Sequence, residues 1–303
     1  MPLIALKTLL YFSIFKYPLT KNELFEFSNV KTIKELDNQI NYLLEKGIVF
    51  KHQNFYITLN DSTLINRRLK GNELAKKIMP KGLKVAKFIS KFPYVESVSI
   101  SGALSKGYYD DDGDIDFFII TKPKRLWIAR TLLILYKKIF LLNSKKYFCV
   151  NYFISSNNLK IAERNRFTAT EMVTLIPVSG EKVFTAFIKE NAWVSNYFPN
   201  KTPLDFFVTT KVKKPLLTLL TEKILNTAIG NFLDNFFRKI TLQKWSSKFS
   251  HLEKEDFKIA MKSTKSVSKH HPQNFQKKVI DILNDKYELI KKQCNLELQQ
   301  EHA

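Results

Sequence analysis

Asp114 and Asp116, two aspartates one residue apart, are the residues of this chain best suited to do chemistry. Side chains alternate between the two faces of a strand, so both carboxylates project from one face while Ile115 and Phe117 point into the opposite, buried one. Two like charges held that close need a cation. Paired carboxylates suit Mg²⁺, which completes its shell with water and phosphate oxygens.

A glycine turn lies a short distance before these aspartates. Val95 to Ile100 form a β-prone run that stops at Ser101-Gly102, and Ile115 to Ile120 form a second run that ends before Pro123. Because glycine has no Cβ, a phosphate could approach the backbone closely at the turn. The amides that follow would donate hydrogen bonds to that anion.

The two features together resemble a known family. Ile100-Ser101-Gly102-Ala103, separated by ten residues from Asp114-Ile115-Asp116-Phe117, is similar to the glycine turn and Asp-x-[Asp/Glu] strand of the DNA polymerase beta-like nucleotidyltransferase superfamily. The resemblance implies an NTP substrate and two Mg²⁺ ions held by Asp114 and Asp116, which are also the catalytic residues. It implies that the nucleotide is bound by Ser101, Gly102, Ala103, Ser105 and Lys106.

Two positions depart from the family's pattern. The family often has Ser where this chain has Ala103, so the backbone alone contributes there unless Ser101 or Ser105 substitutes. The family's third carboxylate corresponds to Asn151, a possible metal ligand that is no base. Removal of the acceptor proton then falls to a metal-activated water, to another acid such as Glu163 or Glu171, or to the substrate.

Two functions follow from these residues. The leading interpretation is a Mg²⁺-dependent nucleotidyltransferase that moves an NMP group from an NTP to a hydroxyl of RNA, of a protein or of a small molecule. The alternative is a catalytically degenerate regulatory protein that binds nucleotide or nucleic acid, which Ala103 and Asn151 favour.

The elements around the motif indicate an α+β (mixed α/β) protein with four parts. Residues 1 to 60 have the helix, helix, helix, hairpin pattern of a winged helix-turn-helix domain, with a capping box at Thr32 to Glu35. That domain reads DNA or serves as a docking element. Residues 61 to 92 are predicted as linker helices that meet at Pro80, and residues 93 to 200 as the nucleotidyltransferase domain, a small mixed sheet with helices.

Residues 201 to 303 are predicted as a helical C-terminal region. Apolar residues recur at helical spacing from Leu216 to Phe237, which indicates one long amphipathic helix that serves as core or as a homodimer interface. Because the glycine turn and both carboxylates lie beyond the linker, we expect the catalytic unit to fold without residues 1 to 60. The resemblance extends over residues 1 to 200, to prokaryotic superfamily members that carry an amino-terminal winged helix.

Composition limits the class of protein and its partners. The formal net charge is +21, and the excess is +11 in residues 61 to 200 and +8 in residues 201 to 303. This distribution indicates an anionic partner, an NTP or nucleic acid, or simply a lysine-rich surface. Cys149 and Cys294 make neither a disulfide framework nor a metal cluster, and no uncharged apolar run is long enough to span a membrane. We therefore expect a cytoplasmic protein without membrane contact.

Overall fold

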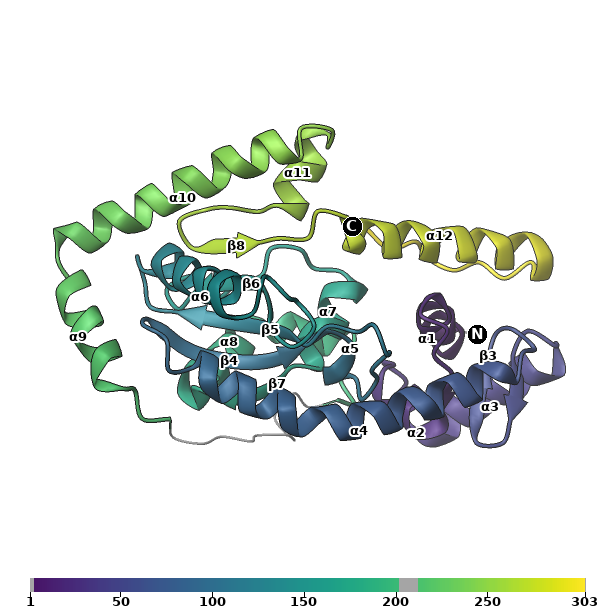
Figure 1. Ribbon diagram of the computed structural model, residues 1–303. Coiled ribbons are helices and arrows are strands. Elements are labelled where there is room, and N and C mark those ends of the chain that lie inside the picture. Colours follow the sequence, from purple (N-terminus) through teal and green to yellow (C-terminus); the bar gives the residue numbers. More distant parts are fainter. Residues whose placement is uncertain (1–2, 202–211, 303) are drawn as a thin grey trace.

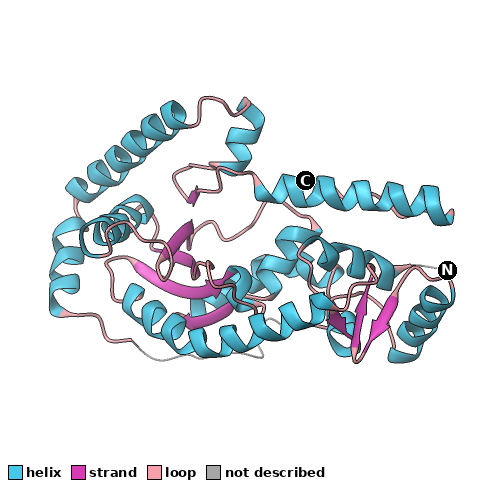
Figure 2. Ribbon diagram, turned by 45° about the vertical axis from the view of Figure 1, so that its right-hand side comes forward, coloured by secondary structure: helices cyan, strands magenta, loops and turns pink. Residues whose placement is uncertain are grey.

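The computed structural model describes residues 3–201 and 212–302, which form a mixed α/β protein with two sheets (Figure 1 and Figure 2). The predicted class is confirmed at that level. A three-stranded sheet lies in the N-terminal segment, and a five-stranded sheet lies in the centre of the molecule. The first residues of the expected C-terminal region, 202–211, lie outside the described residues.

The N-terminal segment contains three helices and a hairpin in the predicted order. Thr20 begins the second helix with a complete capping box, since its hydroxyl accepts from the Glu23 amide and the Glu23 carboxylate accepts from the Thr20 amide. At the third helix Thr32 accepts from the Glu35 amide, but the Glu35 carboxylate bonds to Lys31 N, so the predicted box is half formed. The elements are α1 (Ile4–Ile14), β1 (Leu19–Thr20), α2 (Lys21–Glu26), α3 (Ile33–Glu45), β2 (Phe50–His52) and β3 (Phe55–Ile57), and the antiparallel sheet has the order β1-β3-β2.

One continuous helix, α4 (Thr63–Ile89), stands where the sequence predicts two helices that meet at Pro80. Proline removes one backbone hydrogen bond from a helix interior. Both halves of α4 are nevertheless held by close packing, because Gly71 lies against the Tyr108 ring and Gly82 against Ile100. These contacts stabilise α4 on both sides of Pro80, so the helix continues past the proline.

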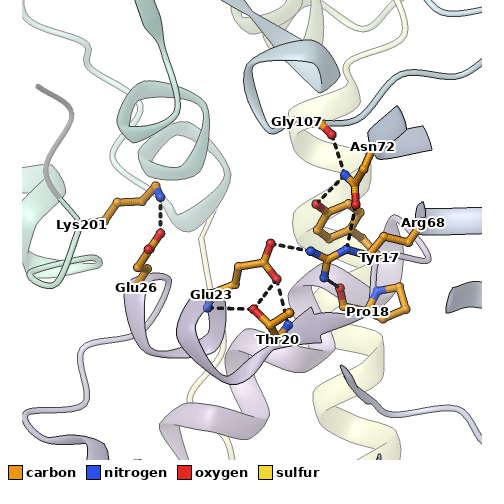
Figure 3. A network of polar contacts seen from close by, with 9 residues as sticks. All are labelled: Tyr17, Pro18, Thr20, Glu23, Glu26, Arg68, Asn72, Gly107 and Lys201. Atoms are coloured by element: carbon orange, nitrogen blue, oxygen red, sulfur yellow. Dashed lines mark hydrogen bonds and ion pairs between the residues drawn. The ribbon is translucent and has the colours of Figure 1, made fainter. Parts of the chain in front are cut away.

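Two polar side chains of α4 fix the N-terminal segment to the rest of the molecule (Figure 3). Arg68 is 6% exposed, and its guanidinium pairs with Glu23 at 2.6 Å and donates to the Pro18 carbonyl. One turn further on, Asn72 Nδ2 donates to the Gly107 carbonyl at 2.5 Å, just after the glycine turn. A buried pair is costly to break. The predicted linker is therefore a packed element that joins the N-terminal segment to the turn.

The central sheet has the strand order β7-β4-β5-β6-β8. β4 pairs antiparallel with β5 and β7, β5 pairs parallel with β6, and β6 pairs antiparallel with β8. The sequence predicts the three inner strands but neither edge strand. Pro177 lies in the edge strand β7, where its missing amide costs little. The bounds are β4 (Val95–Ser101), β5 (Asp116–Thr121), β6 (Cys149–Ser155), β7 (Ile176–Ser179) and β8 (Val267–Lys269).

Alternate residues of β5 enter two cores on opposite faces of the sheet. Phe117 and Ile119 pack with Trp127 and its neighbours on one face, whereas Phe118 shares the other core with Leu6 of α1. Removing residues 1–60 would expose part of that second core, and the expectation that the rest of the chain folds without them stays a prediction. The helices of this part are α5 (Gly102–Ser105), α6 (Leu126–Phe140), α7 (Arg166–Val173), α8 (Glu181–Glu190) and the 3₁₀ helix η1 (Ala192–Asn196).

The C-terminal segment wraps around the sheet and returns to α1 (Figure 1). Asp234 accepts hydrogen bonds from the amides of Trp127 and Ile128 at 2.8 and 3.0 Å and so caps the start of α6. The segment also supplies strand β8, which a purely helical region would lack. Its helices are α9 (Leu216–Leu225), α10 (Ala228–Lys248), α11 (Lys254–Ala260) and α12 (Phe275–Cys294), of which α12 packs against α1.

The predicted long amphipathic helix is two helices, α9 and α10, which form an outer arc of the molecule (Figure 2). Leu225, Leu233 and Phe237 of this arc pack against the core of the central sheet. Other apolar side chains along it are exposed, among them Leu216, Ile224, Ile229, Phe232 and Phe236. No helix in the described ranges is both long enough and apolar enough to cross a membrane.

Candidate active site

A cavity of about 760 Å³ adjoins the glycine turn and Asp116. Side chains of α1, α7, the central strands and the segment from β8 to α12 form its walls, so distant parts of the chain meet there. Its volume falls within the range of roughly 300 to 1,000 Å³ that small-molecule sites occupy. The predicted site residues that line it are Ser101, Gly102, Ala103, Lys106, Asp116 and Asn151. Asp114 and Ser105 lie outside the lining.

Gly102 brings the end of β4 directly against Asp116. Its φ is +68°, in the left-handed region that favours glycine, and a Cβ at this position would lie 2.4 Å from Asp116 Oδ2. Ser101, the last residue of β4, pairs in register with Asp116 across the sheet. The structure thus places the turn and one predicted carboxylate in contact, and glycine alone satisfies both the backbone angle and the space.

The environment of Asp116 disfavours its charged form. Burial raises the pKa of this carboxyl to about 6, and the charges of Glu171 and Asp114 act in the same direction. The Cys149 thiol, which hydrogen-bonds to Asp116, and the Lys106 ammonium partly oppose them. A partly buried carboxylate near two others is short of positive charge, which is what a bound cation would supply.

Asp114 lies in the loop two residues before β5 begins. Its charge is close enough to raise the pKa of Asp116 and of the Tyr109 hydroxyl. Ile115 and Phe117, the alternate residues, are fully buried as predicted. The two aspartates therefore share an electrostatic environment, although Asp116 alone borders the cavity.

Asn151 occupies a bulge in β6. Phe117 pairs with Val150 and Phe118 pairs with Tyr152, so Asn151 is an extra residue between the two pairs. Its side chain reaches the cavity and donates from Nδ2 to Cys149 Sγ at 2.8 Å. That bond directs the amide oxygen away from the thiol and leaves it as the atom that could bind a cation.

Lys106 and Ser105 stabilise the turn by binding its backbone carbonyl. Lys106 Nζ donates to the Gly102 carbonyl at 3.0 Å and pairs with Glu171 Oε1 at 2.8 Å. Ser105 Oγ donates to the same carbonyl at 2.9 Å. These contacts fix the Gly102 carbonyl in place. An anion at the turn would therefore be bound by the backbone amides that follow Gly102.

The residues present fit a magnesium site. Asp116 is a carboxylate whose neighbours raise its pKa, Asp114 is near it, and Asn151 offers an amide oxygen, all of them ligands that Mg²⁺ accepts. Within the described part of the chain, no group of three or more His, Cys, Asp or Glu residues is arranged to hold a metal ion. The fit accordingly depends on two carboxylates and one amide, and the remaining positions would belong to water and phosphate oxygens.

Sequence reasoning misses the opposite wall of the cavity. Lys269, His271 and Gln276 come from the C-terminal segment and line the same cavity as Asp116, which precedes them by more than 150 residues. Their position results from the pairing of β8 with β6, and β8 is too short to leave a pattern in the sequence. Glu171 was open to sequence reasoning as a possible acid, and it lies in the cavity beside Lys106.

No protein-family model, curated protein or solved structure matches this chain. Its function is inferred below from the geometry of the cavity and from the residues of the glycine turn and the Asp-x-Asp motif.

Proposed function

We propose that the protein is a Mg²⁺-dependent nucleotidyltransferase that moves an NMP group from an NTP to a hydroxyl acceptor, built on the nucleotidyltransferase fold. The observation that carries the proposal is the contact between the left-handed Gly102 turn and the Asp116 carboxylate, where no side chain larger than glycine's fits. A backbone turn that can approach phosphates next to a cation-binding carboxylate is what nucleotidyl transfer requires.

In this proposal each part of the site has one role. The amides after Gly102 bind the phosphates, and Lys106 keeps the turn in place through the Gly102 carbonyl. Asp114, Asp116 and the Asn151 amide would hold the Mg²⁺ ions, which when bound neutralise charge on the phosphates of an in-line displacement. Because Asp116 has a pKa of about 6, it is charged and competent for a cation at neutral pH and loses that ability as the pH falls below 6.

Glu171 is the side chain best placed to accept the proton of the acceptor hydroxyl. It lines the cavity, its charge reaches Asp116, and Lys106 holds its carboxylate at 2.8 Å. Glu163 also lines the cavity, but Glu171 is the one of the two whose charge acts on Asp116. β6 offers Asn151 and no base, so α7 would supply this group through Glu171.

The proposal is tested by incubating the protein with each α-labelled NTP, Mg²⁺ and cell extract or a panel of small hydroxyl compounds. We expect label to reach an acceptor with the native protein, to vanish with Asp116→Asn, and to persist with Asp111→Asn. Asp111 is the matched control, because it lies in the same acidic loop but is exposed and paired with Lys70. Equal labelling by all three proteins would exclude the assignment of Asp116.

The second candidate is a protein that binds nucleotide without turnover. The exposed Ala103, which replaces a hydroxyl, and the engagement of Asn151 with Cys149 favour it. In this case the same NTP would bind with a measurable affinity that depends on Mg²⁺, while no acceptor becomes labelled with any compound or extract.

We also infer that residues 1–60 are a winged helix-turn-helix domain, with α3 as the recognition helix and the β2–β3 hairpin as the wing. The exposed positions of α3 include Lys34, Asn38, Asn41 and Glu45, a mixed polar face that suits docking as well as DNA. Duplex binding that weakens steeply with salt would assign the domain to DNA, and weak binding independent of salt would assign it to docking.

A further inference from the structure

Lys269 stands across the sheet from the proposed catalytic corner. It pairs in register with Tyr152 on β6, and Tyr152 pairs with Phe118, two residues after Asp116 on β5. Since residues two apart on a strand share a face, Lys269 lies on the same face as Asp116. Two strand spacings of ~4.8 Å and two residues of ~3.4 Å separate the two backbones by roughly 12 Å.

The Lys269 ammonium is buried without an anionic partner. The residue is 8% exposed, and its Nζ donates to Gln276 Oε1 at 3.0 Å. Glu163 is the acid whose charge reaches it, but Lys262 already holds that carboxylate at 3.0 Å. Among the described residues no carboxylate lies within ion-pair distance of Lys269. A buried charge without a counter-charge is costly, so the arrangement lacks a negative group.

Gln276 adds a donor that is also unpaired. The residue is 5% exposed, and its Nε2 has no hydrogen-bond partner in the described part of the chain. The orientation of the amide is fixed, because turning it over would place two donors, Nε2 and the Lys269 ammonium, against each other. A buried donor without an acceptor carries a desolvation cost that a ligand oxygen would remove.

The start of α12 reinforces the same region. Asn274, Phe275 and Gln276 all line the cavity, and the helix begins at Phe275 without a side-chain cap. The first amides of a helix lack intrahelical partners and carry a partial positive charge. An ammonium, an amide donor and a helix N-terminus therefore meet at one wall of the cavity.

We propose that Lys269, Gln276 and the N-terminal end of α12 form a subsite for an anionic group, a carboxylate or phosphate, of a small-molecule acceptor. The choice of acceptor rests on the proposed function. Its hydroxyl lies at the Gly102–Asp116 corner and its acidic group lies at Lys269, whose backbone is roughly 12 Å from that of Asp116. The cavity volume of about 760 Å³ accommodates such a molecule. Aromatic side chains on the walls, including Tyr152 and Phe275, would cover its apolar part.

Anion binding is tested on the full-length protein without divalent cations, by calorimetric titration with inorganic phosphate. We expect Lys269→Met to weaken phosphate binding by roughly tenfold or more, as expected for loss of a charged hydrogen bond. Lys292→Met, at an exposed lysine near the C-terminal end of α12, should bind phosphate as the native protein does.

Gln276→Glu keeps the test decisive if Lys269→Met fails to fold. This variant places a carboxylate beside the ammonium, so it should raise the melting temperature while phosphate binding is lost. Equal phosphate affinity in the native protein, Lys269→Met and Gln276→Glu would overturn the subsite.

The affinity for NTP shows whether the anion bound at Lys269 belongs to the acceptor or to the nucleotide. An unchanged NTP affinity in Lys269→Met supports the acidic group of the acceptor, whereas a fall that parallels the loss of phosphate binding would overturn that assignment and place the nucleotide's own phosphates at Lys269. Phosphate binding needs neither Mg²⁺ nor turnover. Absence of transfer in the native protein would therefore contradict the proposed function while leaving the result on the subsite intact.

Discussion

At the scale of single residues, the contact between Gly102 and Asp116 decides what the site can hold. The left-handed backbone angle and the close carboxylate each exclude a side chain, for different reasons. Gly107 has a similar φ of +71°, but a Cβ there would meet nothing within 4 Å. Substituting each glycine by alanine therefore separates two contributions to the free energy of unfolding: the left-handed backbone angle, present at both positions, and the contact with Asp116, present only at Gly102.

Gly107→Ala should lower the free energy of unfolding by about 1 kcal/mol, the cost of a left-handed alanine. Gly102→Ala should lower it by about 2 to 4 kcal/mol, because the clash with Asp116 adds an overpacking cost. Chemical denaturation of both variants measures the difference. Adding Asp116→Ala to Gly102→Ala should recover most of the excess, and equal losses in the two single variants would contradict a close contact.

Asp116→Asn should stabilise the protein in the presence of a chelator. The pKa of Asp116 is raised from 3.8 to about 6, so between pH 4 and 6 the folded state binds the proton more tightly than the unfolded state. The free energy of unfolding then falls as the pH rises through that interval, by up to about 3 kcal/mol at pH 7. Asparagine does not ionise and avoids this loss.

Thermal unfolding from pH 4 to pH 8 measures the effect of this substitution. The melting temperature of Asp116→Asn should exceed that of the native protein at pH 8, by about half as much at pH 5, and approach it at pH 4, while Asp111→Asn should follow the native curve. A constant difference at all pH values would show that Asp116 is not the titrating group.

At the scale of elements, α4 connects the N-terminal segment to the glycine turn. Arg68 and Asn72 bind Pro18, Glu23 and the Gly107 carbonyl from one face of the helix. A disturbance in the N-terminal segment therefore has a direct path to the turn, through one helix, the buried Arg68 and the half-buried Asn72.

Pro80→Ala should raise the free energy of unfolding by about 1 to 2 kcal/mol. Alanine restores the missing hydrogen bond in the middle of α4, a gain of up to about 3 kcal/mol, which the greater freedom of the unfolded chain partly offsets. Pro80 is exposed, so the substitution disturbs little packing. Chemical denaturation of Pro80→Ala measures this change, and Lys77→Ala, a substitution at an exposed neighbouring position, is the control. A loss of stability in Pro80→Ala would mean that α4 depends on the backbone geometry that proline imposes at this point.

At the scale of the whole molecule, the C-terminal segment completes the cavity beside Asp116 on one side and presents an apolar surface on the other. Phe232 is 67% exposed and its ring stacks on that of Phe236, with centroids 6.0 Å apart. Large exposed apolar surfaces usually mark an interaction site. The predicted homodimer through the C-terminal helices would use this surface.

Replacing Phe232 and Phe236 together by Glu should convert a dimer into a monomer, because the interface would then have to bury carboxylates without partners. Sedimentation equilibrium measures the state. Lys248→Glu, at an exposed position on the opposite side of the same helix, should remain dimeric. A native protein that is monomeric at all concentrations would contradict this interface.

The sequence alone determined the parts of the molecule that depend on local pattern. The apolar runs that become β4, β5 and β6 are long enough to show their strand character, and Thr20 and Thr32 mark helix starts through contacts three residues away. The glycine turn and the two aspartates are separated by a short loop. Their proximity follows from one antiparallel pairing.

Only the tertiary structure decided the rest, because it depends on contacts between residues far apart in the chain. β8 has three residues and no period of its own, and it exists by pairing with β6 more than 100 residues earlier. Pro80 by itself predicts the end of a helix, but packing on both sides of Pro80 keeps α4 continuous. The Lys269 wall of the cavity could not be predicted for the same reason: its position is set by long-range pairing, which leaves no local signal in the sequence.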